Sequence, residues 1–339
     1  MWQVYGQDHI TRQLETSLTE GRLAHAYLLV GPPHVGKMAL AINLAQAVNC
    51  LEGAGAPCGN CAQCTRISQG IHADVRVVAV GPKEEGGPTR TVIGIDDIKE
   101  VLRQVNLKPF EGSRSVIIFN GAESMSEEAA NALLKTLEEP PDQVLILLLA
   151  HDEDALLPTV RSRCRRLLLR PVAKDLVVSK LVNDYRAEPD QAENLGRMSR
   201  GCLGWAVDAL ANQEILEERE NQVARLSEVC RAGLSDRFSY ANDLASTFSR
   251  DRESARQVLY LWLRWWRDLL LVKEGADEYL HHTDWTEELR LQATQLRTLQ
   301  VVSFIKCLNQ TLEALDRNAS PRLVLELLML NLPGVGIAT

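Results

Sequence analysis

The sequence predicts an α/β domain with a doubly wound parallel sheet, followed by a region built from helices. In the first half of the chain, helical patterns alternate with short apolar runs, as happens when helices cover both faces of a parallel sheet. The first of these runs leads into a glycine-rich loop that opens a helix at Lys37. Beyond Pro171 the apolar runs end, and amphipathic helical patterns fill most of the remaining chain.

Helix and strand patterns in the first half can be placed in chain order. The helices are expected at about 9–20, from 37 to about 49, at 95–105 and at 126–137. Pro140-Pro141 stops the last of them, because proline lacks the N–H group that a helix needs. The strands are expected at 26–30, 74–80, 115–119 and 144–150. The last two are unbroken apolar runs, typical of central strands, and the charged, glycine-rich segment 82–88 is expected to be a loop.

Length and the change of pattern predict three domains. At 339 residues the chain is too long for one ordinary core. We expect a first α/β domain at 1–170 with an inserted cysteine module at 50–64, a small helical domain at 171–212, and a larger helical domain at 213–339.

One helix of the third domain carries an aromatic stripe, formed by Tyr260, Trp262, Trp265 and Trp266. Such a stripe could be a ligand platform or a partner surface. Aromatic side chains within one helix more often fill a helical core, and a core is what we expect here.

Composition and charge narrow the function classes. A hydrophobic content of 45% and a charged content of 24% are ordinary for a globular protein. The chain opens with polar, helix-forming sequence in place of a signal peptide. Its most apolar stretch, 259–272, contains charges and is shorter than the roughly 20 residues of a membrane span. We therefore expect a cytoplasmic protein without a membrane partner, and the formal charge of −8 gives no general attraction for nucleic acid.

The loop from Gly31 to Lys37 has the G-x-x-x-x-G-K spacing of a phosphate loop. It follows a predicted strand and opens a predicted helix, which is the context that gives the motif weight. Gly31 and Gly36 would let backbone N–H groups curl around phosphates at the positive end of the helix. Lys37 would neutralise phosphate charge, so these three residues are the expected nucleotide contacts.

Three groups that an ATPase needs are missing from this site. Met38 stands where Ser or Thr would bind Mg²⁺, and a thioether is a poor ligand for that ion. The strand at 115–119 ends in Asn120-Gly121, where two acidic residues would bind Mg²⁺ and position water. Glu123 is near in sequence, but no register of the strand places it there. Mg²⁺ is therefore not expected, and binding of ATP or ADP stays open.

Four cysteines, Cys50, Cys58, Cys61 and Cys64, follow the phosphate-loop helix in a C-x7-C-x2-C-x2-C pattern. Four thiolates suffice for a closed, structural zinc site. An iron–sulfur cluster or free thiols are the alternatives. The other cysteines are scattered and are expected to be buried apolar side chains: Cys164, Cys202, Cys230 and Cys307.

Three stretches together resemble one family. They are His25-Ala26-Tyr27-Leu28-Leu29-Val30-Gly31-Pro32, Asn131-Ala132-Leu133-Leu134-Lys135-Thr136-Leu137-Glu138-Glu139-Pro140-Pro141, and Ser162-Arg163-Cys164. The chain resembles bacterial clamp-loader subunits, AAA+ proteins of the DNA polymerase III holoenzyme. The resemblance implies that the first domain is an AAA+ domain with a zinc module, the second a helical lid, and the third a collar for oligomerisation.

Within that family, the altered nucleotide site resembles the non-hydrolysing stator of the loader. The ATPase members, called motors, carry an arginine in the lid where this chain has Gly204. They also carry a sensor threonine that the strand ending at His151 lacks. The resemblance implies that Arg163 reaches a neighbouring motor's ATP in trans, as an arginine finger. The alternative is that this residue belongs to a solvated basic edge formed by Arg161, Arg163, Arg165 and Arg166.

The implied function is to help load the sliding clamp on primed DNA without hydrolysing ATP at the chain's own site. The implied partners are the motor (gamma/tau) subunits and the delta subunit, with the clamp and DNA reached through the complex. Two alternatives stay open: an active AAA+ motor subunit or related replication or recombination ATPase, and a zinc-bearing nucleic-acid-binding protein. The missing catalytic groups oppose the first, and the net charge opposes the second.

Overall fold

The computed structural model describes residues 2–53, 55–80, 92–105, 108–317 and 319–334. The segment 82–88, expected to be a loop, lies outside these residues. The chain forms two compact units, Met1–Asp208 and Ala209–Thr339. The first unit holds what the sequence assigned to the first domain and nearly all of the second, and the finer division at 170 and 171 stays a prediction.

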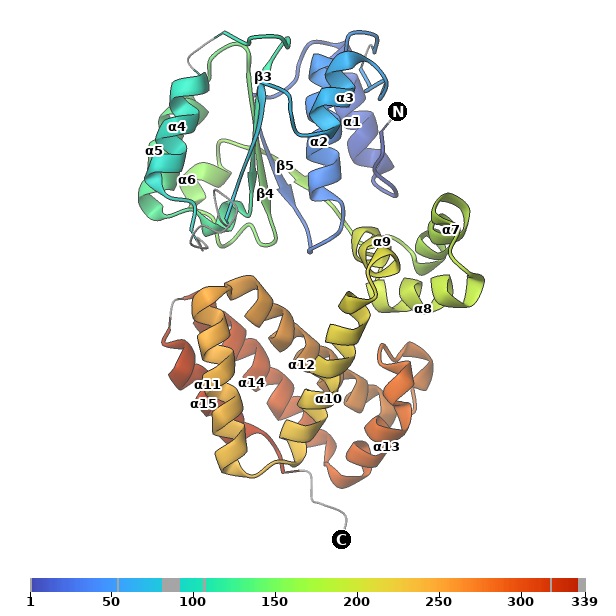
Figure 1. The fold of residues 1–339 in the computed structure, drawn as a ribbon. Helices are drawn as coiled ribbons and strands as arrows, with labels where there is room; N and C mark the ends of the chain where they lie inside the picture. Colours follow the sequence, from blue (N-terminus) through green and yellow to red (C-terminus); the bar gives the residue numbers. More distant parts are fainter. Residues whose placement is uncertain (1, 54, 81–91, 106–107, 318, 335–339) are drawn as a thin grey trace. The chain divides into compact units, whose positions relative to one another are not determined.

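A five-stranded sheet is the centre of the first unit, and all its strand pairs are parallel (Figure 1). The strand order across the sheet is β2-β3-β4-β1-β5. The strands are β1 (Ala26–Val30), β2 (Val75–Ala79), β3 (Ser115–Asn120), β4 (Val144–Ala150) and β5 (Arg165–Leu168). This arrangement confirms the predicted doubly wound parallel sheet of an AAA+ fold.

Side chains of the central strands alternate between two apolar cores. Along β4, Ile146 and Leu148 enter one core, whereas Leu145 and Leu147 enter the other. A strand points successive side chains to opposite faces, so a strand that is apolar at every position must be covered on both. The continuous apolar run at 144–150 is therefore explained by helices on the two faces of the sheet.

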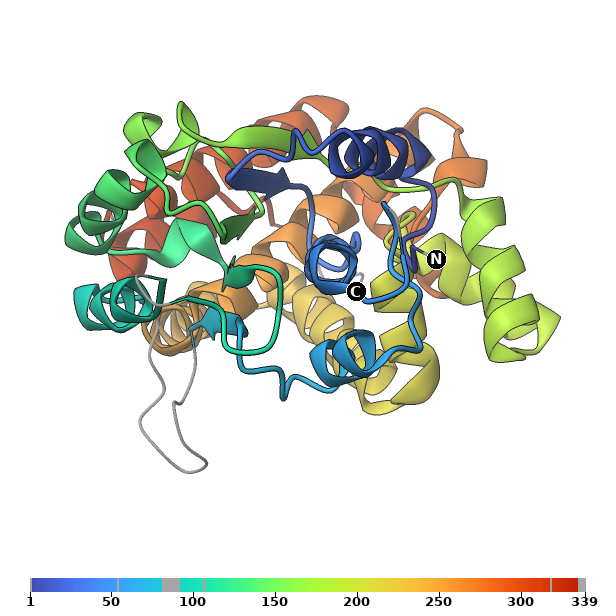
Figure 2. The ribbon, with the colours of Figure 1, turned by 90° about the horizontal axis from the view of Figure 1, so that it is seen from above.

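Helices α1, α2 and α3 lie on one side of the sheet, and α4, α5 and α6 on the other (Figures 1 and 2). Their bounds are α1 (Asp8–Thr19), α2 (Lys37–Asn49), α3 (Ala62–Ser68), α4 (Ile95–Val105), α5 (Glu127–Glu138) and α6 (Pro158–Arg161). Ser126 caps α5 with its side chain, which accepts a hydrogen bond from the Ala129 N–H at 3.1 Å. The four predicted helices and four predicted strands of this region are confirmed. β5, α3 and α6 were not predicted.

Three helices complete the first unit after the sheet: α7 (Lys174–Tyr185), α8 (Pro189–Ser199) and α9 (Leu203–Ala211), the last of which continues into the second unit. α7 and α8 pack against each other through Val177, Leu181, Ala192 and Leu195, all of which are buried. Gly201 adopts a φ of +81° in the turn between α8 and α9. A Cβ atom at this position would lie 2.1 Å from the Val172 carbonyl oxygen. A side chain at this position would collide with that backbone, so glycine is required.

Every regular element that the structure describes in the second unit beyond α9 is helical. The longer helices are α10 (Glu214–Arg231), α11 (Leu234–Arg250), α12 (Arg252–Lys273), α13 (Thr286–Gln295), α14 (Thr298–Asp316) and α15 (Pro321–Asn331). Two single turns, η2 (Asp277–Tyr279) and η3 (Thr283–Trp285), connect α12 to α13. Within the described residues, no helix is both long and apolar enough to cross a membrane.

The aromatic stripe on α12 belongs to the core of this second unit. Trp262, Trp265 and Trp266 are each at most 1% exposed, and Tyr260 is partly buried against the same core. Phe304 on α14 packs on the Trp266 ring, with the ring centres 4.4 Å apart. The expected core role is confirmed, and the stripe is not available as a ligand platform.

Candidate functional sites

The phosphate loop connects β1 to α2 at the carboxyl end of the sheet. Gly36 adopts a φ of +104°, a conformation that side chains disfavour, immediately before the first residue of α2. Gly31 lies so close to β5 that a Cβ atom there would be 2.6 Å from the Leu169 carbonyl oxygen. Both predicted loop glycines are therefore required by the backbone.

Lys37 contacts the loop that carries it. Its side chain is buried, and its Nζ donates hydrogen bonds to the carbonyl oxygens of Gly31 and Pro32, the latter at 2.8 Å. The same Nζ lies 3.1 Å from Nδ1 of His151, which follows β4. The ammonium group thus has partners supplied by the protein itself, at the position where it would meet phosphate.

His151 and Glu123 extend this contact into a chain of polar groups. Glu123 lies in η1 (Ala122–Ser124), which follows β3, and its Oε1 accepts from the His151 N–H at 3.2 Å. That oxygen is 3.6 Å from Nε2 of the same histidine. The other oxygen, Oε2, is buried and has no hydrogen-bond partner among the described residues. The sequence analysis noted both residues but did not bring them together.

The residues at the magnesium positions offer no carboxylate or hydroxyl. Met38 packs at the edge of the core formed by α1 and α2. Asn120 is the exposed last residue of β3, and Gly121 follows it with a φ of +78°. The three positions expected from the sequence therefore lack the hydroxyl and the carboxylates that would bind Mg²⁺ or position water.

The helix α9 approaches the phosphate loop through Gly204. The Gly204 N–H donates to the His34 carbonyl oxygen at 3.1 Å. A Cβ atom at Gly204 would lie 2.8 Å from that oxygen, so a larger residue would require the backbone to shift. Nδ1 of His34 also lies 3.1 Å from an Asp208 carboxylate oxygen.

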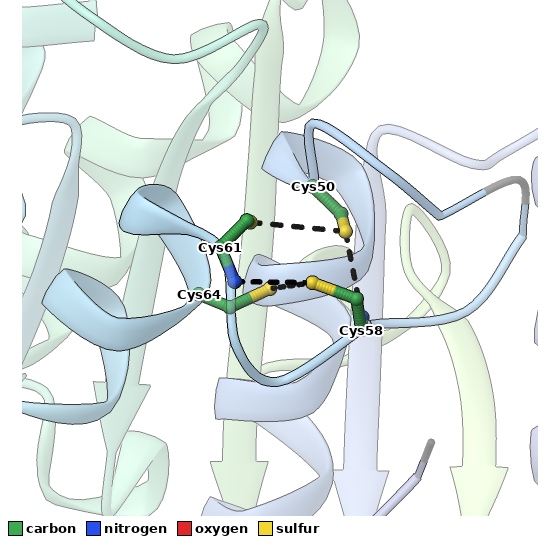
Figure 3. A group of neighbouring side chains, drawn as sticks. All are labelled: Cys50, Cys58, Cys61 and Cys64. Atoms are coloured by element: carbon green, nitrogen blue, oxygen red, sulfur yellow. Dashed lines mark hydrogen bonds between the residues drawn. The ribbon is translucent and has the colours of Figure 1, made fainter.

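The four predicted metal ligands meet in one cluster after α2 (Figure 3). Their sulfur atoms all lie within 4.8 Å of one another. The Cys50 and Cys61 sulfurs are 4.0 Å apart, and those of Cys58 and Cys64 are 3.9 Å apart. Four sulfurs bound at about 2.3 Å to one tetrahedral zinc ion would be about 3.8 Å apart. The cluster therefore fits a metal ion with four thiolate ligands.

Backbone N–H groups around the cluster support negative charge on sulfur. The Cys50 sulfur accepts from the Gly53 N–H at 3.2 Å, and the Cys58 sulfur accepts from the Cys61 N–H at 3.2 Å. Gly53 is needed here, because a Cβ atom would lie 2.0 Å from the Ala56 carbonyl oxygen. The tight turns expected from the sequence are thus turns that point N–H groups at the ligands.

The cysteine thiols also affect one another's ionisation. Burial opposes ionisation of Cys61, but hydrogen bonds from the backbone of Cys64 and Leu51 and from the Cys58 thiol hold its pKa at about 6. Burial and the neighbouring Cys61 and Cys50 thiols raise the pKa of Cys64 to about 12. A divalent cation would allow all four groups to be thiolates, because it offsets their mutual repulsion.

The cysteine module is tied to the loop that precedes β3. Arg66 of α3 forms an ion pair with Glu111, with 2.6 Å between Nη1 and Oε2. Nε2 of Gln63 donates to the Glu111 carbonyl oxygen at 2.8 Å. Outside the cluster, Cys202 and Cys230 are buried as predicted, whereas Cys164 and Cys307 are only half-buried.

Arg163 lies in the turn between α6 and β5, with its side chain 34% exposed. Its Nη2 is 2.6 Å from a Glu138 carboxylate oxygen, and its Nη1 donates to the Thr159 carbonyl oxygen at 2.9 Å. The neighbouring arginines have other partners: Asp154 for Arg161, Gln13 for Arg165 and Glu153 for Arg166. The four arginines are therefore held separately, and only Arg163 contacts the end of α5.

Comparison with known proteins places these features in a family. Residues 6–173 match the family described as DNA polymerase III, delta subunit. Over 326 residues the chain is 28% identical to DNA polymerase III subunit delta' of Bacillus subtilis strain 168, and the match covers 96% of each chain. The chain belongs to the clamp-loader family of DNA polymerase III subunits.

Other clamp-loader relatives match a shorter part of their own length. DNA polymerase III subunit tau/gamma of Haemophilus influenzae is 33% identical over 211 residues, which are 61% of this chain and 29% of that protein. Among solved structures, a DNA polymerase III gamma-subunit-related protein of Thermotoga maritima is 17% identical with a TM-score of 0.43. That alignment covers 96% of this chain and 97% of the other.

Proposed function

We propose that the chain is a delta-prime subunit, the non-hydrolysing stator of the bacterial clamp loader in the DNA polymerase III holoenzyme. In this role it helps to load the sliding clamp on primed DNA, together with motor (gamma/tau) subunits and a delta subunit. The observation that carries the proposal is the nucleotide site, in which Lys37 contacts its own loop and neither a carboxylate nor a hydroxyl stands at Met38, Asn120 or Gly121. The full-length match to a delta' protein agrees with it.

The chemistry of phosphoryl transfer supports this reading of the site. Transfer of a phosphoryl group depends on Mg²⁺ to neutralise charge and on a polar residue that positions water. Asn120 is uncharged and Gly121 has no side chain, so β3 ends without the two carboxylates that would bind Mg²⁺ and position water. We expect the purified chain to show no ATPase activity, with or without primed DNA. ATP hydrolysis that copurifies with the chain and is abolished by Lys37→Ala would instead assign the chain to the motors or to a related ATPase.

In the same proposal, Arg163 serves a neighbouring motor. The arginine is exposed enough to reach a partner and is held in a defined orientation by its own chain. An arginine supplied in trans can stabilise the charge that develops on the transferred phosphoryl group. The stator would thus supply to a partner's site one of the groups that its own site lacks.

Replacement of Arg163 by alanine tests this role. We expect Arg163→Ala to leave the fold intact and to lower the DNA-dependent ATPase of the reconstituted loader by roughly tenfold or more, since fingers of this kind contribute large rate factors. The matched control is Arg166→Ala, which removes a neighbouring arginine that is ion-paired with Glu153. Steady-state ATPase and clamp loading on primed DNA are the measurements, and unchanged values for Arg163→Ala would contradict the proposal.

We also infer that the four-cysteine cluster holds zinc. The metal would be structural, because four protein thiolates leave no coordination position for water. Cys50, Cys58, Cys61 and Cys64 are the ligands, and their spacing fits tetrahedral coordination. Zinc would then fix the loop after α2 and the start of α3.

A further inference from the structure

Glu138 is the last residue of α5, and it forms the shortest contact that Arg163 makes. The distance between Glu138 Oε1 and Arg163 Nη2 is 2.6 Å, typical of a charge-assisted hydrogen bond. Both side chains keep solvent contact, with 49% of the glutamate and 34% of the arginine exposed. A pair this exposed adds little to folding stability. Its effect is on where the guanidinium points.

The position of Glu138 in its helix argues against a role in stabilising α5. The carboxyl end of a helix carries partial negative charge, so a carboxylate there is unfavourable unless a cation offsets it. Arg163 supplies that cation from the turn after α6. Glu139, the next residue, is also exposed and has no ion pair within the described chain. Of the two adjacent exposed glutamates, Glu138 is therefore the one that contacts the arginine.

Two further acceptors, from Thr159 and Ser162, bind the guanidinium group of Arg163. Nη1 donates to the Thr159 carbonyl oxygen at 2.9 Å and to the Ser162 hydroxyl at 3.2 Å. An arginine side chain has five N–H donors. With Glu138, Thr159 and Ser162 as acceptors, three are used, which leaves two donors without an acceptor among the residues that the structure describes.

We propose that Glu138 is a positioning residue for Arg163, holding the guanidinium so that two N–H groups can meet the phosphate of a nucleotide bound by a neighbouring subunit. The inference rests on the proposed function, in which Arg163 acts in trans. A free arginine would lose side-chain entropy when it docks, whereas one already held by acceptors has lost part of it before the partner arrives. Guanidinium donors lie on separate edges, so carboxylate and phosphate can be bound together.

A double-mutant cycle in the reconstituted loader tests the proposal. The variants are Glu138→Ala, Arg163→Ala and the two combined, with Glu139→Ala as the matched control. We expect Glu138→Ala to lower the kcat of DNA-dependent ATP hydrolysis about tenfold with little change in KM, as expected for a misplaced catalytic group. In the Arg163→Ala background, Glu138→Ala should change nothing further, because it acts through the arginine. Glu138→Gln, which keeps an acceptor oxygen, should recover part of the rate.

Each outcome has a separate meaning. If Arg163→Ala lowers the rate and Glu138→Ala does not, the inference is wrong and the proposed function stands. Equal losses from Glu138→Ala in both backgrounds would also overturn it, since the glutamate would then act elsewhere. A higher rate in Glu138→Ala would show that the pair withholds the arginine, contrary to the inference. No effect of Arg163→Ala would remove the proposed function itself. Size-exclusion chromatography of each loader checks that all variants assemble.

Discussion

Asp74, just before β2, organises the loop that joins the cysteine module to the sheet. Its two carboxylate oxygens accept hydrogen bonds from three successive backbone N–H groups, those of Phe110, Glu111 and Gly112, at 2.7, 2.8 and 2.7 Å. Burial alone would raise the pKa of Asp74, but these bonds outweigh it and, with help from His72, hold that pKa below its ordinary value. The negative charge of one side chain therefore fixes three residues of loop backbone.

The variant Asp74→Asn should destabilise the protein by about 2 kcal/mol at pH 7, because charge-assisted bonds are lost and an amide N–H₂ group faces N–H donors. A depressed folded pKa gives stability that is complete above the unfolded value and is lost as the pH falls through the folded value. The difference between the two proteins should therefore shrink below about pH 4. Urea unfolding across pH measures it. Asp96→Asn, at an exposed aspartate paired with Lys99, is the control, and a difference that does not change with pH would contradict the argument.

The sequence was enough to identify the missing Mg²⁺-binding groups at the nucleotide site. Met38 follows the lysine of the phosphate-loop motif, and Asn120 follows the apolar run of a predicted strand. The contact of Lys37 with His151, and of His151 with Glu123, could not be located in that way. It depends on β3 and β4 being neighbours in a register that places Asn120 opposite Leu149. The sequence did hold a signal for this contact: Glu123 and His151 follow two predicted strands, and polar residues after neighbouring parallel strands lie at the same edge of the sheet.

The cysteine module is an element with little core of its own. Among its described residues, the buried ones are Pro57, Cys61, Cys64, Ile67 and a few polar residues in and after α3. A helix of seven residues is too short to be stable alone in water. Its stability must come from packing against α2, from the contacts of Glu111 with Arg66 and Gln63 and, as proposed, from a bound metal ion. This dependence explains why the spacing of the cysteines predicted the site while periodicity did not predict α3.

Metal analysis tests the module directly. We expect one zinc per chain by elemental analysis, and a variant with Cys61→Ser should lose most of it, because three thiolates bind more weakly than four. Backbone amides of α3 should then exchange hydrogen faster, while those of β1 and β4 stay protected. Cys307→Ser, at a half-buried cysteine outside the cluster, is the control and should keep its zinc. Iron with visible absorption in place of zinc would overturn the assignment.

The strand β5 was not predicted, because its sequence lacks the apolar run that marks a central strand. It has four residues, and its first two, Arg165 and Arg166, are exposed. It pairs only with β1, at the edge of the sheet, so it needs no apolar run. Central strands such as β4 were predicted with correct ends because both of their faces are buried. Edge strands depend on neighbours that the local sequence does not reveal.

At the scale of the whole molecule, the two units have separate apolar cores. The buried residues of the second unit's core run from Val223 to Leu332, whereas the two cores on the faces of the sheet lie between Val4 and Leu169. Among the described residues, none belongs to the cores of both units. The sequence predicted a change to helices at about 171 and a further boundary at 212; the two units meet at Asp208, close to the second of these positions, and α7 and α8 lie in the first unit.

Separate cores predict separate unfolding, which Trp266→Ala tests. Trp266 is fully buried in the second unit against Phe304, and removal of so large a side chain should cost roughly 3–5 kcal/mol. Because the sheet shares no core residue with this site, amides of β1 and β4 should keep their hydrogen-exchange protection while those of α12 and α14 lose it. Phe119→Ala, at a fully buried position in the first unit, should give the reverse pattern. Loss of protection in both units after either substitution would mean that the chain unfolds as one cooperative body, despite its divided cores.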